Sequence, residues 1–181
     1  DYTPTEVVLY KEGLVDGIEV MNTDDFYPGI IDRALEKNLF MSANTDIHQT
    51  TVLEHNGFHR PMTLILAKER TLEAVREALD ECRTIAYGYN TLCGEEQLLK
   101  DFFAAGVKTA VMHRTSSFTS VALTNMTSVP YVVRMEGRNQ MKLDPFQTLW
   151  IKVSGDKTTL DLEVLNMFYS KDKHPVVQLP F

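Results

Sequence analysis

The spacing of hydrophobic residues changes near residue 106, and this change limits the fold more than any other feature of the sequence. Before this point, short apolar runs typical of strands alternate with segments whose apolar residues recur every three or four positions, as in helices. After it, apolar and polar residues alternate with a period of two, and turn residues separate the runs. The sequence therefore predicts two parts of different class, a mixed α/β part followed by an all-β part.

The order of elements in the first part predicts a parallel sheet. Four strand-like runs lie at 17–22, 39–43, 61–67 and 84–87. A segment with helical spacing separates the first from the second and the third from the fourth, and a polar loop separates the second from the third. Because a β-α-β order usually gives parallel strands with right-handed crossovers, residues 1–95 are expected to form such a sheet. Residues 96–106 are expected to be a bridging helix or linker. The alternating segment 107–181 is expected to form a small β-sandwich.

Two segments of the first part carry the signals of a helix start. Thr3, followed by Pro4 and Glu6, is typical of a capping box with proline at the first helical position. Thr71 is an N-cap residue before another helical segment. The apolar stripe of the first helix consists of Val7, Val8 and Leu14. The face of the second helix that is expected to be buried consists of Leu72, Val75, Leu79 and Cys82.

Composition excludes several classes of protein. The 181 residues carry 18 basic and 25 acidic side chains, which give a net charge of −7, and the basic residues are scattered. Nucleic-acid binding, which needs clustered Lys and Arg, is therefore not expected. No apolar stretch approaches the roughly 18 to 20 residues that cross a membrane. Cys82 and Cys93 fit neither a disulfide scaffold nor a zinc ribbon, so the cellular compartment stays open.

The tripeptide Asp46-Ile47-His48 is the clearest candidate for chemistry. It comes directly after the strand-like run 39–43, so Asp46 and His48 are expected on the same side of the chain at the carboxyl end of that strand. Active sites of parallel α/β folds lie at this edge. Aspartate and histidine together suit a borderline divalent metal such as zinc, manganese or iron. A hydrogen-bonded loop is the alternative interpretation.

Three further residues could belong to such a site, and each has a simpler interpretation. Glu19 is a carboxylate inside an apolar strand, where it must be paired, ligate a cation or be exposed by the strand alternation. His59 lies in a glycine-containing loop, where a role in a flexible loop is simpler. Arg60 could hold a phosphate through its two-pronged guanidinium group, although exposed arginines are common.

A resemblance to a known family connects these residues. The first part of the chain resembles the carboxyl-terminal half of the PHP-domain metal-dependent phosphoesterases, named after polymerase and histidinol phosphatase. The resemblance rests on the order of four segments, Gly17-Ile18-Glu19-Val20-Met21-Asn22, Asn44-Thr45-Asp46-Ile47-His48, Arg60-Pro61-Met62-Thr63 and Ala67-Lys68-Glu69-Arg70-Thr71. The later strands resemble the appended β domain that some bacterial members of the family carry.

The resemblance implies a fold, a cofactor and a ligand pair. The family fold is a distorted β/α barrel with a metal cluster at the strand ends, so residues 1–95 are expected to be part of a PHP-type barrel of parallel strands. The closing Asp-x-His motif of the family matches Asp46 and His48, which are therefore expected to bind divalent zinc, manganese or iron. Glu19 and Asn22, together with His59 and Arg60, are expected to support these ligands or to contact the substrate.

The other metal ligands of the family precede its Asp-x-His motif and have no counterpart in this sequence. The chain is therefore expected to be the second part of a hydrolase whose missing amino-terminal half completes the site, and to be inactive alone. The expected reaction is hydrolysis of a phosphate ester, such as a phosphorylated small molecule, by metal-activated water. An incomplete barrel would leave an unpaired strand edge, which favours self-association. The alternative is a non-catalytic binding or structural module that retains a degenerate PHP-like fold.

Overall fold

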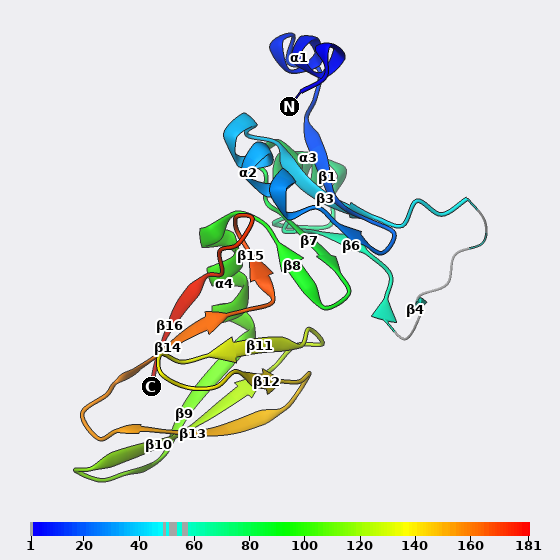
Figure 1. Ribbon diagram of the computed structural model, residues 1–181. Coiled ribbons are helices and arrows are strands. Elements are labelled where there is room, and N and C mark those ends of the chain that lie inside the picture. The colour runs from blue at the N-terminus through cyan, green and yellow to red at the C-terminus, as the bar shows by residue number, and fades with distance from the viewer. Residues whose placement is uncertain (1, 49, 51–53, 56–57) are drawn as a thin grey trace. The chain divides into compact units, whose positions relative to one another are not determined.

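The chain folds into two compact units. The computed structural model describes residues 2–48, 50, 54–55 and 58–181 (Figure 1). Unit 1 contains residues 1–95 together with 168–173. Unit 2 contains residues 96–167 together with 174–181. The chain thus returns to unit 1 for one short segment before its last strand.

Unit 1 begins with a helix and a small mixed sheet. Helix α1 (Pro4–Lys11) starts with the predicted capping box, in which the Thr3 hydroxyl and the Glu6 carboxylate each accept a hydrogen bond from the other residue's backbone N–H. The strands β1 (Gly17–Asn22) and β3 (Phe40–Asn44) pair in parallel, and β2 (Asp25–Phe26) folds back antiparallel on β1. Helix α2 (Pro28–Lys37) connects β2 with β3 and ends at Asn38, which has the left-handed backbone conformation common at helix ends.

A second sheet of unit 1 is antiparallel. The strands β6 (Met62–Ile65), β7 (Thr84–Gly88) and β8 (Thr91–Cys93) pair in sequence order, and helix α3 (Leu72–Asp80) lies between β6 and β7 in the chain. Two further short strands, β4 (Glu54–His55) and β5 (Phe58–His59), pair with each other in antiparallel orientation. The strand β15 (Met167–Phe168) leads back into unit 1, where the Phe168 carbonyl accepts a hydrogen bond from the Gly94 N–H.

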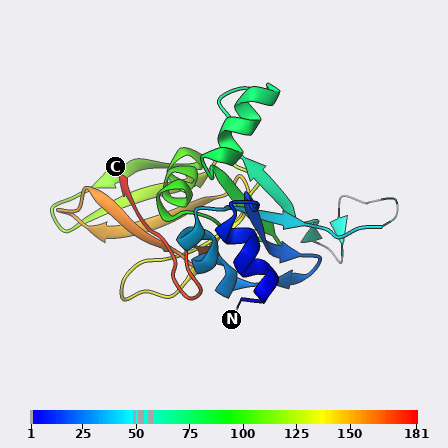
Figure 2. The ribbon, with the colours of Figure 1, turned by 90° about the horizontal axis from the view of Figure 1, so that it is seen from above.

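The predicted fold class, a partial PHP-type β/α barrel of parallel strands followed by a small β-sandwich, is wrong. The described residues form several small mixed or antiparallel sheets and no barrel of parallel strands. One reason is local: Tyr89 and Asn90 both have positive φ, which makes the β7–β8 connection a tight hairpin. The other is that α3 does not cross over the sheet. The hydrogen bond from Leu66 N to Arg83 O continues the antiparallel β6–β7 ladder, so α3 lies at the end of this pair (Figure 2).

Two threonine hydroxyl groups complete the backbone hydrogen bonding of β3 on the side away from β1. The Thr84 hydroxyl accepts from Met41 N at 3.1 Å and donates to Met41 O at 2.8 Å. The Thr63 hydroxyl accepts from Ala43 N at 3.0 Å and donates to Ala43 O at 3.2 Å. Residues of β6 and β7 thereby satisfy backbone groups that a neighbouring strand would otherwise bind.

The core of unit 1 lies between the two sheets and α2. It contains Val20, Met21, Ile31, Ala34, Met41, Ala43, Ala86 and Cys93. The predicted faces of the other two helices differ from those observed. No residue of α1 is buried, and Val8 is 56% exposed. In α3 the buried residues are Ala74 and Ala78, whereas Leu72 is 79% exposed, so this helix packs through small residues rather than through its leucines.

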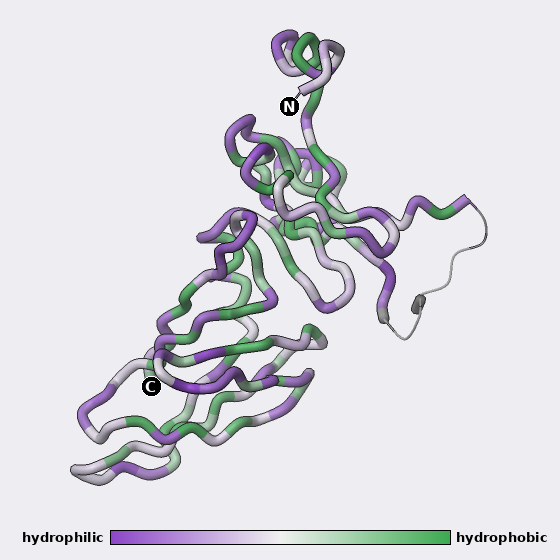
Figure 3. Tube along the Cα trace, viewed as in Figure 1, coloured by the Kyte–Doolittle hydropathy of each residue, from purple (hydrophilic) through white to green (hydrophobic). Residues whose placement is uncertain are grey.

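Unit 2 contains one helix and two antiparallel sheets. Helix α4 (Glu96–Gly106) buries Leu99 and Phe103. The two sheets have the strand orders β13-β10-β9 and β12-β11-β14-β16, and Figure 3 shows the alternation of apolar and polar residues along their strands. The strand bounds are β9 (Val107–Arg114), β10 (Phe118–Asn125), β11 (Tyr131–Arg134), β12 (Met141–Leu143), β13 (Thr148–Ser154), β14 (Thr159–Val164) and β16 (Val176–Pro180). Among the described residues no helix is long and apolar enough to span a membrane.

Candidate functional site

The Asp46 and His48 side chains lie close together after the end of β3. That strand ends at Asn44, and Asp46 has a φ of 48°, in the left-handed region that few residues other than glycine adopt. The Asp46 Oδ1 atom lies 3.4 Å from His48 Nε2, and the two side chains are 56% and 85% exposed. The arrangement thus presents a carboxylate oxygen and an imidazole nitrogen side by side, both open to an incoming group.

Glu19 lies at the centre of a polar cluster on the parallel pair β1–β3. The Glu19 carboxylate accepts one hydrogen bond from Asn22 Nδ2 at 2.6 Å and another from Asn44 Nδ2. Asn44 Nδ2 also lies 3.2 Å from Ser42 Oγ. Glu19 is therefore neither an isolated buried charge nor a freely exposed one, because each carboxylate oxygen accepts a hydrogen bond from an amide.

A bulge in β1 allows the side chains of this cluster to meet. Glu19 pairs with Ser42 and Asn22 pairs with Asn44, so three steps along β1 match two steps along β3. Such an extra residue reverses the alternation of side chains beyond it. Asn22, which in a regular strand would point away from Glu19, therefore lies on the same side as Glu19. The cluster joins the carboxyl ends of both parallel strands, directly before the segment that carries Asp46.

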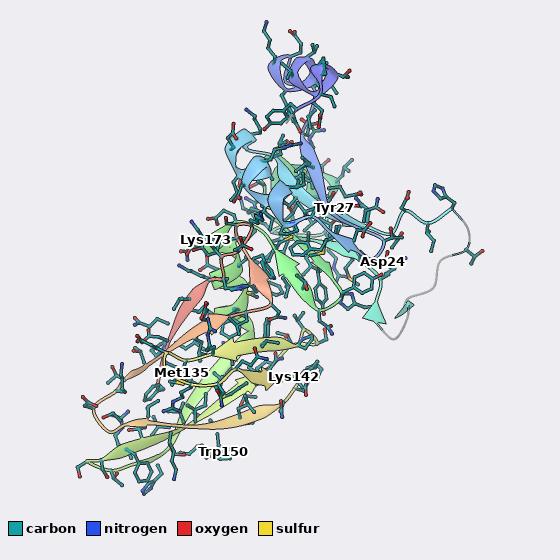
Figure 4. All side chains as sticks on the ribbon, in the orientation of Figure 1. Asp24, Tyr27, Met135, Lys142, Trp150 and Lys173 are labelled. Carbon is teal, nitrogen blue, oxygen red and sulfur yellow. The ribbon has the colours of Figure 1, made fainter. Side chains whose placement is uncertain are left out.

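The turn between β1 and β2 adds negative charge near these strand ends. The Tyr27 hydroxyl donates to Asp25 Oδ2 at 3.2 Å. This hydrogen bond raises the pKa of the Tyr27 hydroxyl, and burial and the charges of Asp25, Glu19 and Asp24 raise it further. Figure 4 labels Asp24 and Tyr27 on this part of unit 1. The resulting local potential favours cations.

The His59 ring is held by neighbours on both of its nitrogens. Its Nδ1 atom lies 2.9 Å from the Arg60 carbonyl oxygen, which can only accept. The Asn90 N–H donates to Nε2 across 3.4 Å. These two contacts fit a ring that donates from Nδ1 and accepts at Nε2. The ring also stacks on Tyr87, with the two ring centroids 3.9 Å apart. The His59 side chain is thus packed against β7 rather than extending from a flexible loop.

The structure brings some of the predicted site residues together and leaves others apart. Asp46 lies beside His48, and Glu19 beside Asn22. By contrast, His59 contacts the β7–β8 region, and its Nδ1 atom lies near the carbonyl oxygen of the half-buried Arg60. Among the described residues, no group of three or more His, Cys, Asp or Glu side chains could by itself hold a metal ion. The part of the chain that the structure describes thus brings Asp46 and His48 side by side but contains no complete metal centre.

The Asp46–His48 pair fits two positions of a metal coordination sphere. Two ligand atoms about 2.1 Å from one tetrahedral ion lie about 3.4 Å apart. The Asp46 Oδ1 to His48 Nε2 distance is 3.4 Å. An oxygen and a nitrogen ligand suit zinc, manganese or iron better than calcium or magnesium, which prefer oxygen. The donor set therefore agrees with the divalent metals expected from the sequence, without selecting one.

Sequence reasoning missed three residues that shape this region. Asn44 and Ser42 belong to the Glu19 cluster, and Tyr87 supports the His59 ring. Asn44 carried a detectable signal, because it is a polar residue at a predicted strand end next to Asp46. The involvement of Ser42 and Tyr87 depends on strand register and on the bulge in β1, which spacing in the sequence does not reveal.

Comparison with known proteins gives one informative similarity. No family model matches the chain, and no curated protein matches it. The fold is similar to the crystal structure of a two-domain protein from Bacteroides vulgatus that contains a predicted PHP-like metal-dependent phosphoesterase, with a TM-score of 0.90 and 32% sequence identity. The match covers 100% of this chain and 57% of that protein. The similarity supports a PHP-like relationship, and the chain spans little more than half the length of the protein it resembles.

Proposed function

We propose that this chain forms part of a metal-dependent phosphoesterase in which Asp46 and His48 are two of the metal ligands. The observation that carries the proposal is the 3.4 Å separation of the Asp46 carboxylate oxygen and the His48 imidazole nitrogen, both exposed at a strand end. The similarity to a protein that contains a predicted PHP-like metal-dependent phosphoesterase supports the reaction class. The substrate class that follows is a phosphate ester, such as a phosphorylated small molecule.

In this proposal the remaining metal ligands do not belong to these 181 residues. They come from an amino-terminal half of the same protein. Two ligands leave most positions of an ion to water, which is too few for a stable catalytic centre. The bacteroidal protein has room for such residues, because the chain matches only 57% of its length. The residues present here would thus complete the site rather than form it.

The residues of this chain have distinct roles in the proposed reaction. A bound divalent metal supplies a Lewis acid that stabilises phosphate charge and lowers the pKa of water. Asp46 and His48 hold that ion. Glu19 accepts hydrogen bonds from Asn22 and Asn44 and so fixes the end of β3, from which Asp46 and His48 extend. Arg60, with a planar fork of donors, is suited to bind a phosphate oxygen, and His59 orients the Arg60 backbone.

A second candidate function is a non-catalytic binding or structural module. The observation that favours it is that the described residues contain no group of three or more potential ligands. In that case Asp46 and His48 would form only a weak surface contact, since exposed pairs contribute little. The two functions differ in one measurable property, which is metal-dependent turnover of the longer protein.

The 181-residue chain alone is expected to hydrolyse no aryl phosphate with added manganese or zinc, whereas the longer protein encoded by its parent gene is expected to show metal-dependent turnover. The reason is that the 181-residue chain supplies only two of the proposed ligands, which are too few to hold a catalytic metal ion. Both proteins would be assayed side by side on p-nitrophenyl phosphate, with a chelator as the control. Turnover by the 181-residue chain would contradict the shared-site proposal, and a longer protein that is inactive with every metal would favour the module.

The Glu19→Gln substitution is expected to weaken metal binding by the longer protein about 10-fold to 100-fold, the range usual for residues that orient ligands. Asn22 and Asn44 donate to different oxygens of Glu19, and glutamine replaces one of these oxygens by an NH2 group, which cannot accept the hydrogen bond. The measurement is the metal dissociation constant by competition with a chromophoric chelator. The matched control is Glu163→Gln, which changes an equivalent charge in unit 2. Equal affinities for the Glu19 and Glu163 variants would show that Glu19 does not position the ligands.

A further inference from the structure

The outward face of the β9–β10–β13 sheet in unit 2 carries an exposed tryptophan. On β10 the residues of one face, Thr119, Val121, Leu123 and Asn125, are all buried and form the inner side of the sheet. Trp150 pairs with Ala122, which belongs to the opposite, outward set. Trp150 is the only tryptophan of the chain and is 65% exposed. Figure 4 shows it directed away from the other strands of unit 2.

The surroundings of Trp150 contain small side chains and hydroxyl groups. Across the sheet the row runs from Trp150 through Ala122 to Ala110, so two small side chains lie beside the indole. In the next row the hydroxyls of Thr124 and Thr148 lie 2.9 Å apart on the same face. Large aliphatic side chains, which form the centre of most protein interfaces, are not part of these two rows. The face is thus an aromatic platform with polar groups at its side.

The charges on this face have one sign. Lys108 pairs with Thr124, and Lys152 pairs with Ser120, so both lysines belong to the outward set. Lys152 Nζ lies 5.0 Å from the centroid of the Phe118 ring. The outward positions of these three described strands contain no carboxylate, although the whole chain has a net charge of −7. A local excess of positive charge on an acidic protein selects an anionic partner.

We propose that this face binds an anionic polysaccharide. A sugar ring has an apolar face of C–H groups, which packs on an indole, and a polar edge of hydroxyl groups, which threonine and serine hydroxyls can bind. Lys108 and Lys152, on opposite sides of the Trp150 row, would bind carboxylate or sulfate groups of the chain. The rigid indole gives contact area at a low cost in conformational entropy.

Other occupants fit this face less well. Single-stranded nucleic acid needs several aromatic side chains that stack successive bases along a basic groove. Here one exposed indole lies among small side chains, and Phe118 is only half exposed between Lys152 and His113. A second protein or a second copy of the chain would need a larger apolar centre. This inference concerns unit 2 alone and is independent of the proposed phosphoesterase function.

The test uses the single tryptophan as its reporter. Addition of polygalacturonate or of chondroitin sulfate to the 181-residue chain is expected to change Trp150 fluorescence with saturation, and fully methyl-esterified pectin, which lacks the charge, is expected to bind at least about 10-fold more weakly. Salt should weaken the binding of the acidic chains. Absence of binding to both acidic polysaccharides would overturn the proposal, and so would equal binding of the esterified form.

Variants separate the platform from general attraction between charges. The affinity of each variant is measured by electrophoresis in gels that contain the polysaccharide. The Trp150→Ala variant is expected to bind at least about 10-fold more weakly than the unsubstituted chain, and the Lys152→Ala variant about threefold more weakly. The control Phe146→Ala removes another aromatic side chain, 70% exposed, that lies outside the three strands. Circular dichroism melting would verify the fold of each variant. Unchanged affinity of a folded Trp150→Ala chain, tighter binding of oligo-dT, or a dimer that only this substitution dissociates would each overturn the proposal.

Discussion

Replacing His48 by alanine in the longer protein is expected to lower its metal affinity by at least about 100-fold. The imidazole would be one of two ligands from this chain, and the loss of a ligand should exceed the 10-fold to 100-fold loss usual for residues that only orient ligands. His48 is 85% exposed, so its removal leaves no cavity and should not change the stability of unit 1. The measurement is metal content after dialysis, by elemental analysis, together with turnover.

The matched control for this experiment is His113→Ala. This histidine is also exposed, but it lies on β9 in unit 2 and not beside a predicted ligand. It should therefore retain the metal content of the unsubstituted protein. An Asp46→Ala, His48→Ala double variant that keeps its full metal content would remove both residues from the proposed coordination sphere. A variant with its metal retained but no turnover would instead assign His48 to a different role.

Replacing Phe103 by alanine is expected to lower the free energy of unfolding of unit 2 by about 3–5 kcal/mol, the range for buried aromatic side chains. Phe103 is fully buried on α4, and its ring contacts Tyr131 edge to face with centroids 4.9 Å apart. The substitution would leave a cavity and would remove this aromatic contact. The measurement is a urea titration followed by circular dichroism and by Trp150 fluorescence, which reports on unit 2.

The control for Phe103 is Phe146→Ala, since this side chain is 70% exposed. Its loss should change the free energy of unfolding by less than about 0.5 kcal/mol. Equal effects of the two substitutions would mean that α4 does not belong to the core of unit 2. Such a result would support the interpretation of residues 96–106 as a linker, which the sequence suggested.

The sequence predicted local features of the fold better than the arrangement of the strands. The capping box at Thr3 and the N-cap at Thr71 depend only on neighbouring residues, and the structure has both. The parallel β1–β3 pair is also of the expected kind. The barrel prediction failed because a helix between two strands does not require a crossover. The direction of β7 is set by the ladder with β6, which the spacing of residues does not encode.

In the candidate site, too, contacts between neighbouring residues could be predicted, whereas contacts between distant residues could not. Asp46 and His48 are two residues apart, so their closeness could be predicted from local geometry. The Glu19 cluster joins residues 25 positions apart, and it depends on the bulge in β1 that brings Asn22 to the same side. The prediction that Glu19 supports the ligands stays a prediction, and the structure adds Asn44 as the residue through which it would act. The metal-ligand role of Asp46 and His48 also awaits measurement.

The hydroxyl groups of Thr84 and Thr63 have a consequence for how unit 1 folds. Each bonds a backbone N–H and a carbonyl of β3, and the contacts of Thr84 with Met41 span 43 positions of the chain. A nascent chain that ends before residue 84 therefore has β1 and β3 but lacks this partner. During synthesis the backbone groups of β3 on the side away from β1 are therefore available for pairing with strands of other chains. They bind Thr84 only after this distant segment has been made, as expected for contacts of high sequence separation. The vulnerable species is thus the growing chain rather than the finished protein.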